Sequence, residues 1–174
     1  VANAVILGAD VLMLSDETAN GEYPLETVAA MKRVILYTQE HIPVAPIQDE
    51  ITQATPHLDA IAAAAVKLAE QLKVVAIIAK TKTGATAEVI AAYRPNVPII
   101  SITSDVRTAQ KLSLCYATKS YVRPDGEGVA FDLAMELKSQ GLFGEEDDMR
   151  VAIVAGQQPG VPGTTDTIRV RLLE

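Results

Sequence analysis

From residue 57 onward, short apolar runs alternate with stretches of helical periodicity. Runs such as 74–79 lack polar alternation, which is typical of strands buried on both faces of a parallel sheet. This alternation predicts an α/β fold, a mostly parallel sheet with helices on both faces and right-handed crossovers. The predicted strands are 74–79, 98–103, 120–122, 149–155 and 166–172, and the predicted helices are 58–72, 86–93, 106–114 and 129–140. The last strand alternates apolar and polar residues, so we expect it to have one exposed face.

The first forty or so residues form a smaller pattern of their own. Residues 1–7 resemble a helix, and the apolar run 9–15 predicts a buried strand. Pro24 then begins an amphipathic helix that extends to about residue 40. One strand and two helical stretches are too little to close a core alone.

Residues 42–56 contain several prolines and no sustained period, which is typical of a linker. We therefore divide the chain into a partial domain, residues 1–41, and a compact domain, residues 42–174. The chain begins at Val1, inside an apolar stretch, which is a rare start for a natural protein. We interpret the chain as a fragment.

The charge balance and the cysteine count exclude several functions. The chain has 15 basic and 22 acidic residues and a net charge of −7, which argues against broad contact with nucleic acid. The longest apolar runs are strand-sized, so we expect no membrane contact. The single cysteine, Cys115, favours a reducing cytoplasmic setting. Neither His41 nor His57 has a partner at ligand spacing, so we expect no metal site.

A first candidate site lies between a predicted strand and a predicted helix, at residues 81–86. Ligands of open α/β sheets bind beyond the carboxyl ends of strands, and a helix N-terminus there suits a phosphate. The alternative is that a threonine merely caps the helix. The candidate ligands are Thr81, Lys82, Thr83, Gly84 and Thr86.

Two further segments are weaker candidates. The Gly/Pro-rich loop 156–165 is longer than a hairpin needs, and such loops often bind ligands. Taken alone, it is better explained as a plain surface loop. Ser15-Asp16-Glu17-Thr18 follows the predicted strand 9–15, where barrel active sites lie. Taken alone, it is better explained as a turn with solvated acids.

Together these segments resemble pyruvate kinases over the whole chain and in the family's order. The sequence ANAV at 2–5 with Gly8, MLSDETANG at 13–21 and Tyr23-Pro24 are similar to the last barrel strand and following helix of that family. The sequences YRP at 93–95, PII at 98–100, PG at 159–160 and GTTDTIRV at 163–170 are similar to its C-terminal domain. The resemblance implies a five-stranded regulatory domain with an antiparallel last strand, preceded by the last β/α unit of a (β/α)₈ barrel.

The resemblance also implies the reaction of the parent enzyme, a phosphotransferase of glycolysis. Pyruvate kinases move phosphate from phosphoenolpyruvate to ADP and use Mg²⁺ and commonly K⁺. The residues that hold the metal and the reacting phosphate belong to earlier barrel strands, which are missing here. We therefore expect no metal or other cofactor in this fragment and no activity from it alone. Its catalytic remnants are Ser15 and Glu17, with Asp16 where the family usually has glycine.

The C-terminal domain of this family binds phosphorylated effectors and helps to hold a homotetramer together. The resemblance assigns the phosphate pocket to the turn at 81–86. In bisphosphate-activated members a Trp and an Arg hold the second phosphate, whereas this chain has no Trp and carries Gln157-Gln158. We therefore expect AMP, ribose 5-phosphate or glucose 6-phosphate rather than fructose 1,6-bisphosphate. The alternative is an assembly module without a responsive site. The expected effector-loop residues are Gly156, Gln157, Gly160, Gly163 and Thr164.

Overall fold

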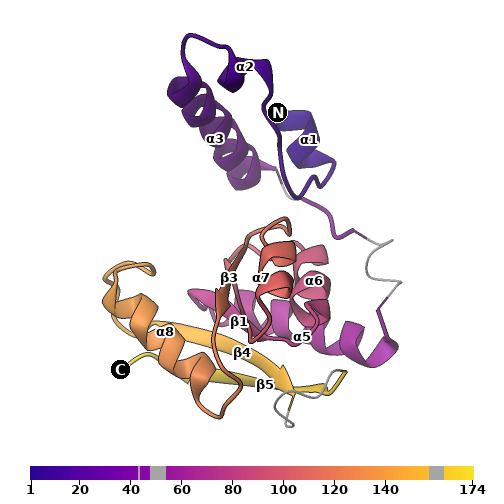
Figure 1. Ribbon diagram of the computed structural model, residues 1–174. Coiled ribbons are helices and arrows are strands. Elements are labelled where there is room, and N and C mark those ends of the chain that lie inside the picture. The colour runs from indigo at the N-terminus through magenta and orange to yellow at the C-terminus, as the bar shows by residue number, and fades with distance from the viewer. Residues whose placement is uncertain (43, 48–53, 157–162) are drawn as a thin grey trace. The chain divides into compact units, whose positions relative to one another are not determined.

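The computed structural model describes residues 1–42, 44–47, 54–156 and 163–174 (Figure 1). The chain divides into two compact units, Val1–Pro46 and Ile47–Glu174. The division falls inside 42–56, the segment expected to link two domains.

The first unit consists of three helices: α1 (Ala2–Ile6), α2 (Asp16–Ala19) and α3 (Pro24–His41). Both α1 and α2 pack against α3. The helix predicted from Pro24 is confirmed, and the fixed φ of proline suits this first helical position. Among the described residues of this unit only Val5 and Thr38 are buried.

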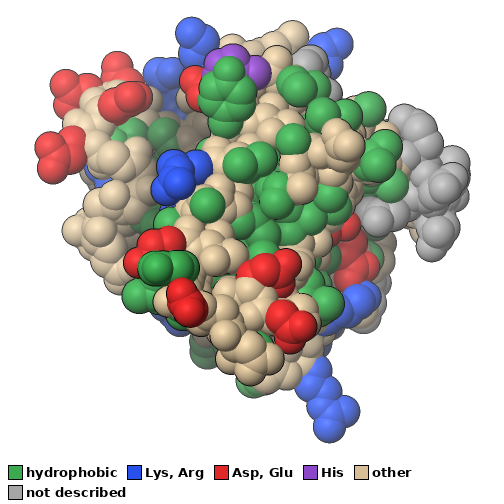
Figure 2. All heavy atoms as spheres, turned by 90° about the horizontal axis from the view of Figure 1, so that it is seen from above, with side chains coloured by type: hydrophobic (Ala, Val, Ile, Leu, Met, Phe, Trp, Pro, Cys, Tyr) green, Lys and Arg blue, Asp and Glu red, His purple; other side chains and the backbone are tan. Residues whose placement is uncertain are grey.

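The strand predicted at 9–15 is wrong, because these residues have no regular secondary structure. Val11 is 51% exposed and Met13 is 88% exposed, so the run is not buried either. A strand needs a neighbour to satisfy its backbone N–H and C=O groups, and the described part of this unit offers none. Leu7, Leu25 and Tyr37 of this unit are exposed as well, and Figure 2 shows that hydrophobic side chains of the molecule are common on the face seen from above. The apolar character of the run therefore does not by itself produce a strand.

The second unit contains a five-stranded sheet in the order β3-β2-β1-β4-β5. Its strands β1 to β4 are parallel and β5 is antiparallel to β4, which confirms the expected fold class. The sheet is made of β1 (Ala76–Lys80), β2 (Ile99–Thr103), β3 (Thr118–Val122), β4 (Arg150–Gly156) and β5 (Thr165–Leu172).

Helices cover both faces of this sheet, as predicted (Figure 1). Three of them pack on one face around Ile77 and Ile99: α5 (Pro56–Gln71), α6 (Ala85–Ala92) and α7 (Val106–Leu112). On the opposite face, α8 (Val129–Ser139) packs around Ile78. Helix α5 begins two residues before its predicted start because Thr55 caps it, its Oγ1 accepting a hydrogen bond of 3.3 Å from the Leu58 N–H.

The connections out of β1 and β4 leave the sheet in opposite directions. From β1 the chain continues through α6 to β2, whereas from β4 it continues to β5 on the other side. Since β1 and β4 are parallel neighbours, their carboxyl ends form the topological switch point of the sheet. The turn 81–84 and the connection from Gly156 to β5 both start at this point.

Truncation of a core side chain should destabilise the second unit. Leu137 on α8 is 1% exposed, so we expect Leu137→Ala to lower the free energy of unfolding by about 2–5 kcal/mol through lost burial and a cavity. Urea denaturation followed by circular dichroism measures this loss. The matched control is Leu114→Ala, whose side chain is 64% exposed and should cost less than about 1 kcal/mol. Equal losses in the two variants would contradict the α8 packing.

Candidate functional site

The turn from β1 into α6 is built around Thr81 and Gly84. The Thr81 N–H donates to the carbonyl of Ile102 on β2 at 2.9 Å, which fixes the start of the turn. The buried Thr81 Oγ1 accepts a hydrogen bond of 3.0 Å from the Gly84 N–H. Gly84 has φ +97°, and a Cβ there would lie 3.2 Å from Glu88 Oε1, so glycine suits this position. The result is a tight turn that presents the first-turn N–H groups of α6, which have no helical acceptor.

Lys82 joins this turn to the loops that follow β2 and β3. Its Nζ donates to Ser104 Oγ at 2.8 Å and pairs with Asp125 Oδ2 at 3.1 Å. Ser104 Oγ also donates to Asp125 Oδ2, at 3.0 Å. The hydrogen bond from Lys82 lowers the pKa of the Asp125 carboxyl, and that from Ser104 adds to the effect. A charged lysine is therefore held at the carboxyl edge of the sheet, partly neutralised by an aspartate.

The sequence analysis missed Ser104 and Asp125 as members of this site. Both follow strands of a parallel sheet, and the carboxyl ends of such strands lie at the same edge as the 81–86 turn. That topological signal was available before the structure was known. The actual pairing with Lys82 depends on side-chain directions that sequence spacing does not give.

The remaining threonines of the turn have different surroundings. Thr83 is exposed, so its hydroxyl is accessible to a ligand. Thr86 is 4% exposed, and its Oγ1 lies 2.7 Å from Thr165 Oγ1 at the start of β5. Thr86 therefore connects α6 to the end of the expected effector loop.

Three of the expected effector-loop residues lie in the described part of the chain. A Cβ on Gly156 would lie 2.4 Å from the carbonyl oxygen of Thr164. The backbone segments at Gly156 and Thr164 therefore approach too closely for any residue other than glycine at position 156. The register between β4 and β5 shifts at Ala155/Gly156, which is typical of a bulge. Gly163 has φ +78° and is exposed. Gln157 and Gly160 lie outside the described residues.

Ser15 and Glu17 belong to the first unit and form a local turn at the start of α2. The Ser15 N–H donates to Glu17 Oε2 at 3.0 Å, and Thr18 Oγ1 donates to the Ser15 carbonyl at 3.1 Å. Hydrogen bonds from the backbone N–H groups of Glu17 and Ser15 lower the pKa of the exposed Glu17 carboxyl. These contacts are those of a helix start with an acid in its first turn.

Within residues 1–42, 44–47, 54–156 and 163–174, no three His, Cys, Asp or Glu side chains come together in a way that could hold a metal ion. No helix in that same part of the chain is long and apolar enough to cross a membrane.

The chain is similar to known pyruvate kinases along its whole length. A family profile described as "Pyruvate kinase, alpha/beta domain" matches residues 59–171. The chain is 34% identical to pyruvate kinase 2 of Synechocystis, over 100% of this chain and 29% of that protein. It is 37% identical to the pyruvate kinase of Agrobacterium vitis, over 98% of this chain and 36% of that protein. The chain thus spans about a third of the length of these relatives.

A solved structure extends this similarity to the fold. The crystal structure of a pyruvate kinase from Cryptosporidium parvum matches with a TM-score of 0.81 and 28% sequence identity. The match covers 99% of this chain and 35% of that one.

The Lys82–Asp125 pair gives a pH-dependent prediction. Lys82→Met should raise the pKa of Asp125 toward its usual range, because the main hydrogen-bond donor to the carboxylate is lost. Since folding lowers this pKa, the stabilisation by the pair is present above the unfolded-state pKa and is lost as the pH falls through the folded-state pKa. Carbon-13 NMR titration of the Asp125 carboxyl measures the shift. Lys80→Met is the control, with a smaller effect expected, and an unchanged Asp125 pKa in Lys82→Met would contradict the pairing.

Proposed function

The chain belongs to the pyruvate kinase family, and we propose that it is the effector-binding and assembly part of an enzyme that transfers phosphate from phosphoenolpyruvate to ADP. The observation that supports this role most strongly is the 81–86 turn at the switch point of the sheet. It combines the N-terminus of α6, the cation of Lys82 and the exposed hydroxyl of Thr83. These groups are hydrogen-bond donors carried by one short turn, and a phosphate requires several such donors.

The present partners of Lys82 determine how a phosphate binds at this turn. In the structure its ammonium group is shared by Ser104 and Asp125. A dianionic phosphate competes with a single aspartate for this cation and also receives the N–H groups of α6. Because Lys82 is 40% exposed, its side chain can swing between the two acceptors without unpacking the core. We propose that the effector replaces Asp125 as the partner of Lys82.

The proposed effector carries one phosphate. The chain has no tryptophan, and Gln157-Gln158 follow Gly156 where bisphosphate-activated relatives of this family present a Trp and an Arg. AMP, ribose 5-phosphate and glucose 6-phosphate are therefore favoured over fructose 1,6-bisphosphate.

The catalytic step itself is proposed to need residues beyond this chain. Ser15 and Glu17 are the proposed barrel-mouth remnants, and the hydrogen bonds described for them are local ones within residues 15–18. We propose that Mg²⁺ and K⁺ serve the complete enzyme and are held by residues outside this chain. Positioned cations dominate phosphoryl transfer. We place the complete enzyme in the cytoplasm, in keeping with the single cysteine.

An assembly role is supported by a separate observation. Strand β5 is the last in the sheet order, so one of its edges has no neighbouring strand within the sheet. Such an edge offers N–H and C=O groups to a strand of another chain. We propose that a homotetramer uses this domain for contact between subunits.

Titration with phosphorylated compounds tests the effector role. We expect AMP, ribose 5-phosphate or glucose 6-phosphate to bind the 174-residue chain saturably in isothermal titration calorimetry, and fructose 1,6-bisphosphate to bind no more tightly. Thr83→Asp should weaken binding about tenfold or more, because a carboxylate beside the phosphate repels it. Thr83 is exposed, so this change should leave the fold intact.

The control for this titration is Ser139→Asp, which adds the same charge at an exposed position on α8 and should leave the affinity unchanged. Absence of binding by a folded chain would contradict the effector role. Sedimentation then tests the alternative, since an assembly module should sediment as an oligomer without any phosphorylated compound.

The chain alone should form no pyruvate. A coupled assay with phosphoenolpyruvate, ADP, Mg²⁺ and K⁺ measures this, with a complete pyruvate kinase as the positive control. Detectable turnover that is lost in Glu17→Gln would show that the chain carries a working catalytic site.

A further inference from the structure

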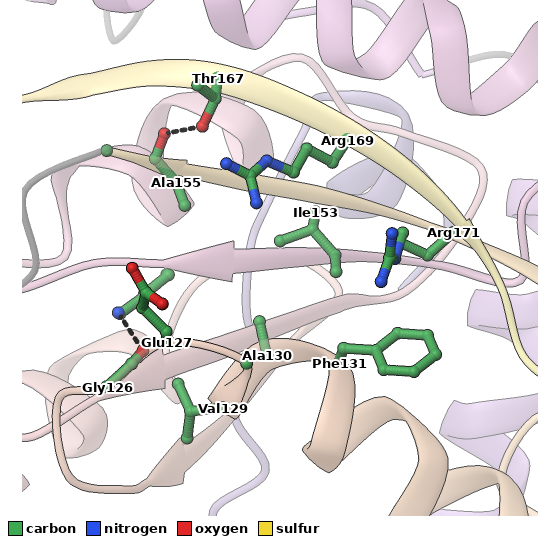
Figure 3. Close-up of a pocket in the computed structure, with 13 residues that line it drawn as sticks. Gly126, Glu127, Val129, Ala130, Phe131, Ile153, Ala155, Thr167, Arg169 and Arg171 are labelled. Carbon is green, nitrogen blue, oxygen red and sulfur yellow. Dashed lines mark hydrogen bonds between the residues drawn. The ribbon is translucent and has the colours of Figure 1, made fainter.

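A cavity of about 370 Å³ lies on the α8 face of the sheet (Figure 3). Its walls come from the loop before α8, the first turn of α8, and the strands β4 and β5. None of its lining residues belongs to the 81–86 turn. The lining residues are Lys80, Gly126, Glu127, Gly128, Val129, Ala130, Phe131, Ile153, Ala155, Gly156, Thr167, Arg169 and Arg171.

The alternation of β5 places its arginines in this cavity. Arg169 and Arg171 are two residues apart, so both lie on the same face of the strand. Ile168 lies on the other face, where it packs against the core under α5, α6 and α7. In the antiparallel register Arg169 is opposite Ile153 of β4. An apolar side chain therefore lies beside the arginine on the same face of the sheet. Figure 3 shows the two arginine side chains on the same side of β5, with Ile153 beside them and Phe131 below Arg171.

The charge of the cavity is opposite to that of the whole chain. Its lining includes three cations, Lys80, Arg169 and Arg171, and one acid, Glu127. The chain as a whole has a net charge of −7. Lys80 Nζ donates one hydrogen bond of 2.8 Å to the Gly126 carbonyl, which leaves two of its three protons for another acceptor.

The apolar part of the lining is arranged beside these cations. The guanidinium of Arg171 lies 5.1 Å from the centroid of the Phe131 ring, a cation–π contact that orients it. Val129 and Ile153 add further apolar surface. The hydroxyl of Thr167 already donates to the Ala155 carbonyl at 2.8 Å, so it is not the main donor to a ligand.

We propose that this cavity binds a small phosphorylated molecule with a flat apolar ring. The phosphate pairs with Arg169 and Arg171, whose planar guanidinium groups match phosphate geometry. The ring lies against Phe131 and Val129. A volume of about 370 Å³ is at the small end of the usual range for ligand pockets, which suits a molecule of this size. Both arginines are exposed, so salt should weaken the binding.

NMR titration of the 174-residue chain tests the proposal, with phenyl phosphate as the probe and phenol as its neutral counterpart. We expect phenyl phosphate to shift the backbone amides of residues 126–131 and 167–171 and the Nε–H signals of both arginines. The affinity should fall about tenfold or more in the double variant Arg169→Gln/Arg171→Gln, because both charge-assisted bonds are lost. The double variant Arg169→Lys/Arg171→Lys keeps the charge and should retain part of the affinity.

The controls separate this site from other sources of signal. Lys32→Gln/Arg33→Gln removes two exposed charges from α3 and should leave the affinity unchanged. Thr83→Asp should leave these shifts unchanged even if it abolishes binding at the 81–86 turn, so the two sites fail independently. The proposal is overturned if the shifts are confined to 81–86, if the double glutamine variant binds equally well, or if phenol shifts the same amides as strongly.

Discussion

The pairing of β1 with a parallel neighbour on each side is the constraint on which the second unit depends. Residues Ala76 to Ala79 are completely buried, so their backbone groups must find partners within the sheet. Strands β2 and β4 supply these partners, one on each edge. The connections that leave β1 and β4 then run to opposite sides of the sheet, so these two segments diverge at the carboxyl ends of the strands. The 81–86 turn and the start of β5 meet at that divergence through Thr86 and Thr165.

The two faces of the sheet are covered unequally, and this difference separates the two proposed ligand sites. Helices α5, α6 and α7 cover one face, and α5 reaches as far as β5. Among the described helices, α8 is the one that packs on the other face, against β1 and β4. The face of β5 that points away from α5 is therefore less covered. Arg169 and Arg171 lie on this face and line the cavity. One sheet thus carries the 81–86 turn at its carboxyl edge and the basic cavity on its less covered face.

Most of the fold followed from the sequence, because buried strands and amphipathic helices leave periodic patterns. The alternation after residue 57 predicted every strand of the second unit to within a few residues. The same kind of argument failed at 9–15, where an apolar run has no strand to pair with. An apolar run indicates that a segment can be buried. A strand additionally needs a neighbouring strand that pairs with its backbone N–H and C=O groups. In the first unit the partner is missing from the described residues, so the run stays irregular.

The sequence by itself determined the fold class, the order of the elements and the position of the 81–86 turn, since these depend on local periodicity and chain order. It also determined that Arg169 and Arg171 share a face of their strand. Only the tertiary structure decided that Asp125 pairs with Lys82, that Arg171 contacts Phe131 of α8, and that both arginines line one cavity. These contacts join segments far apart in the chain, and they depend on which helix packs on which face. The spacing of residues along the sequence does not predict these distances between side chains, because the packing of helices on the sheet determines them.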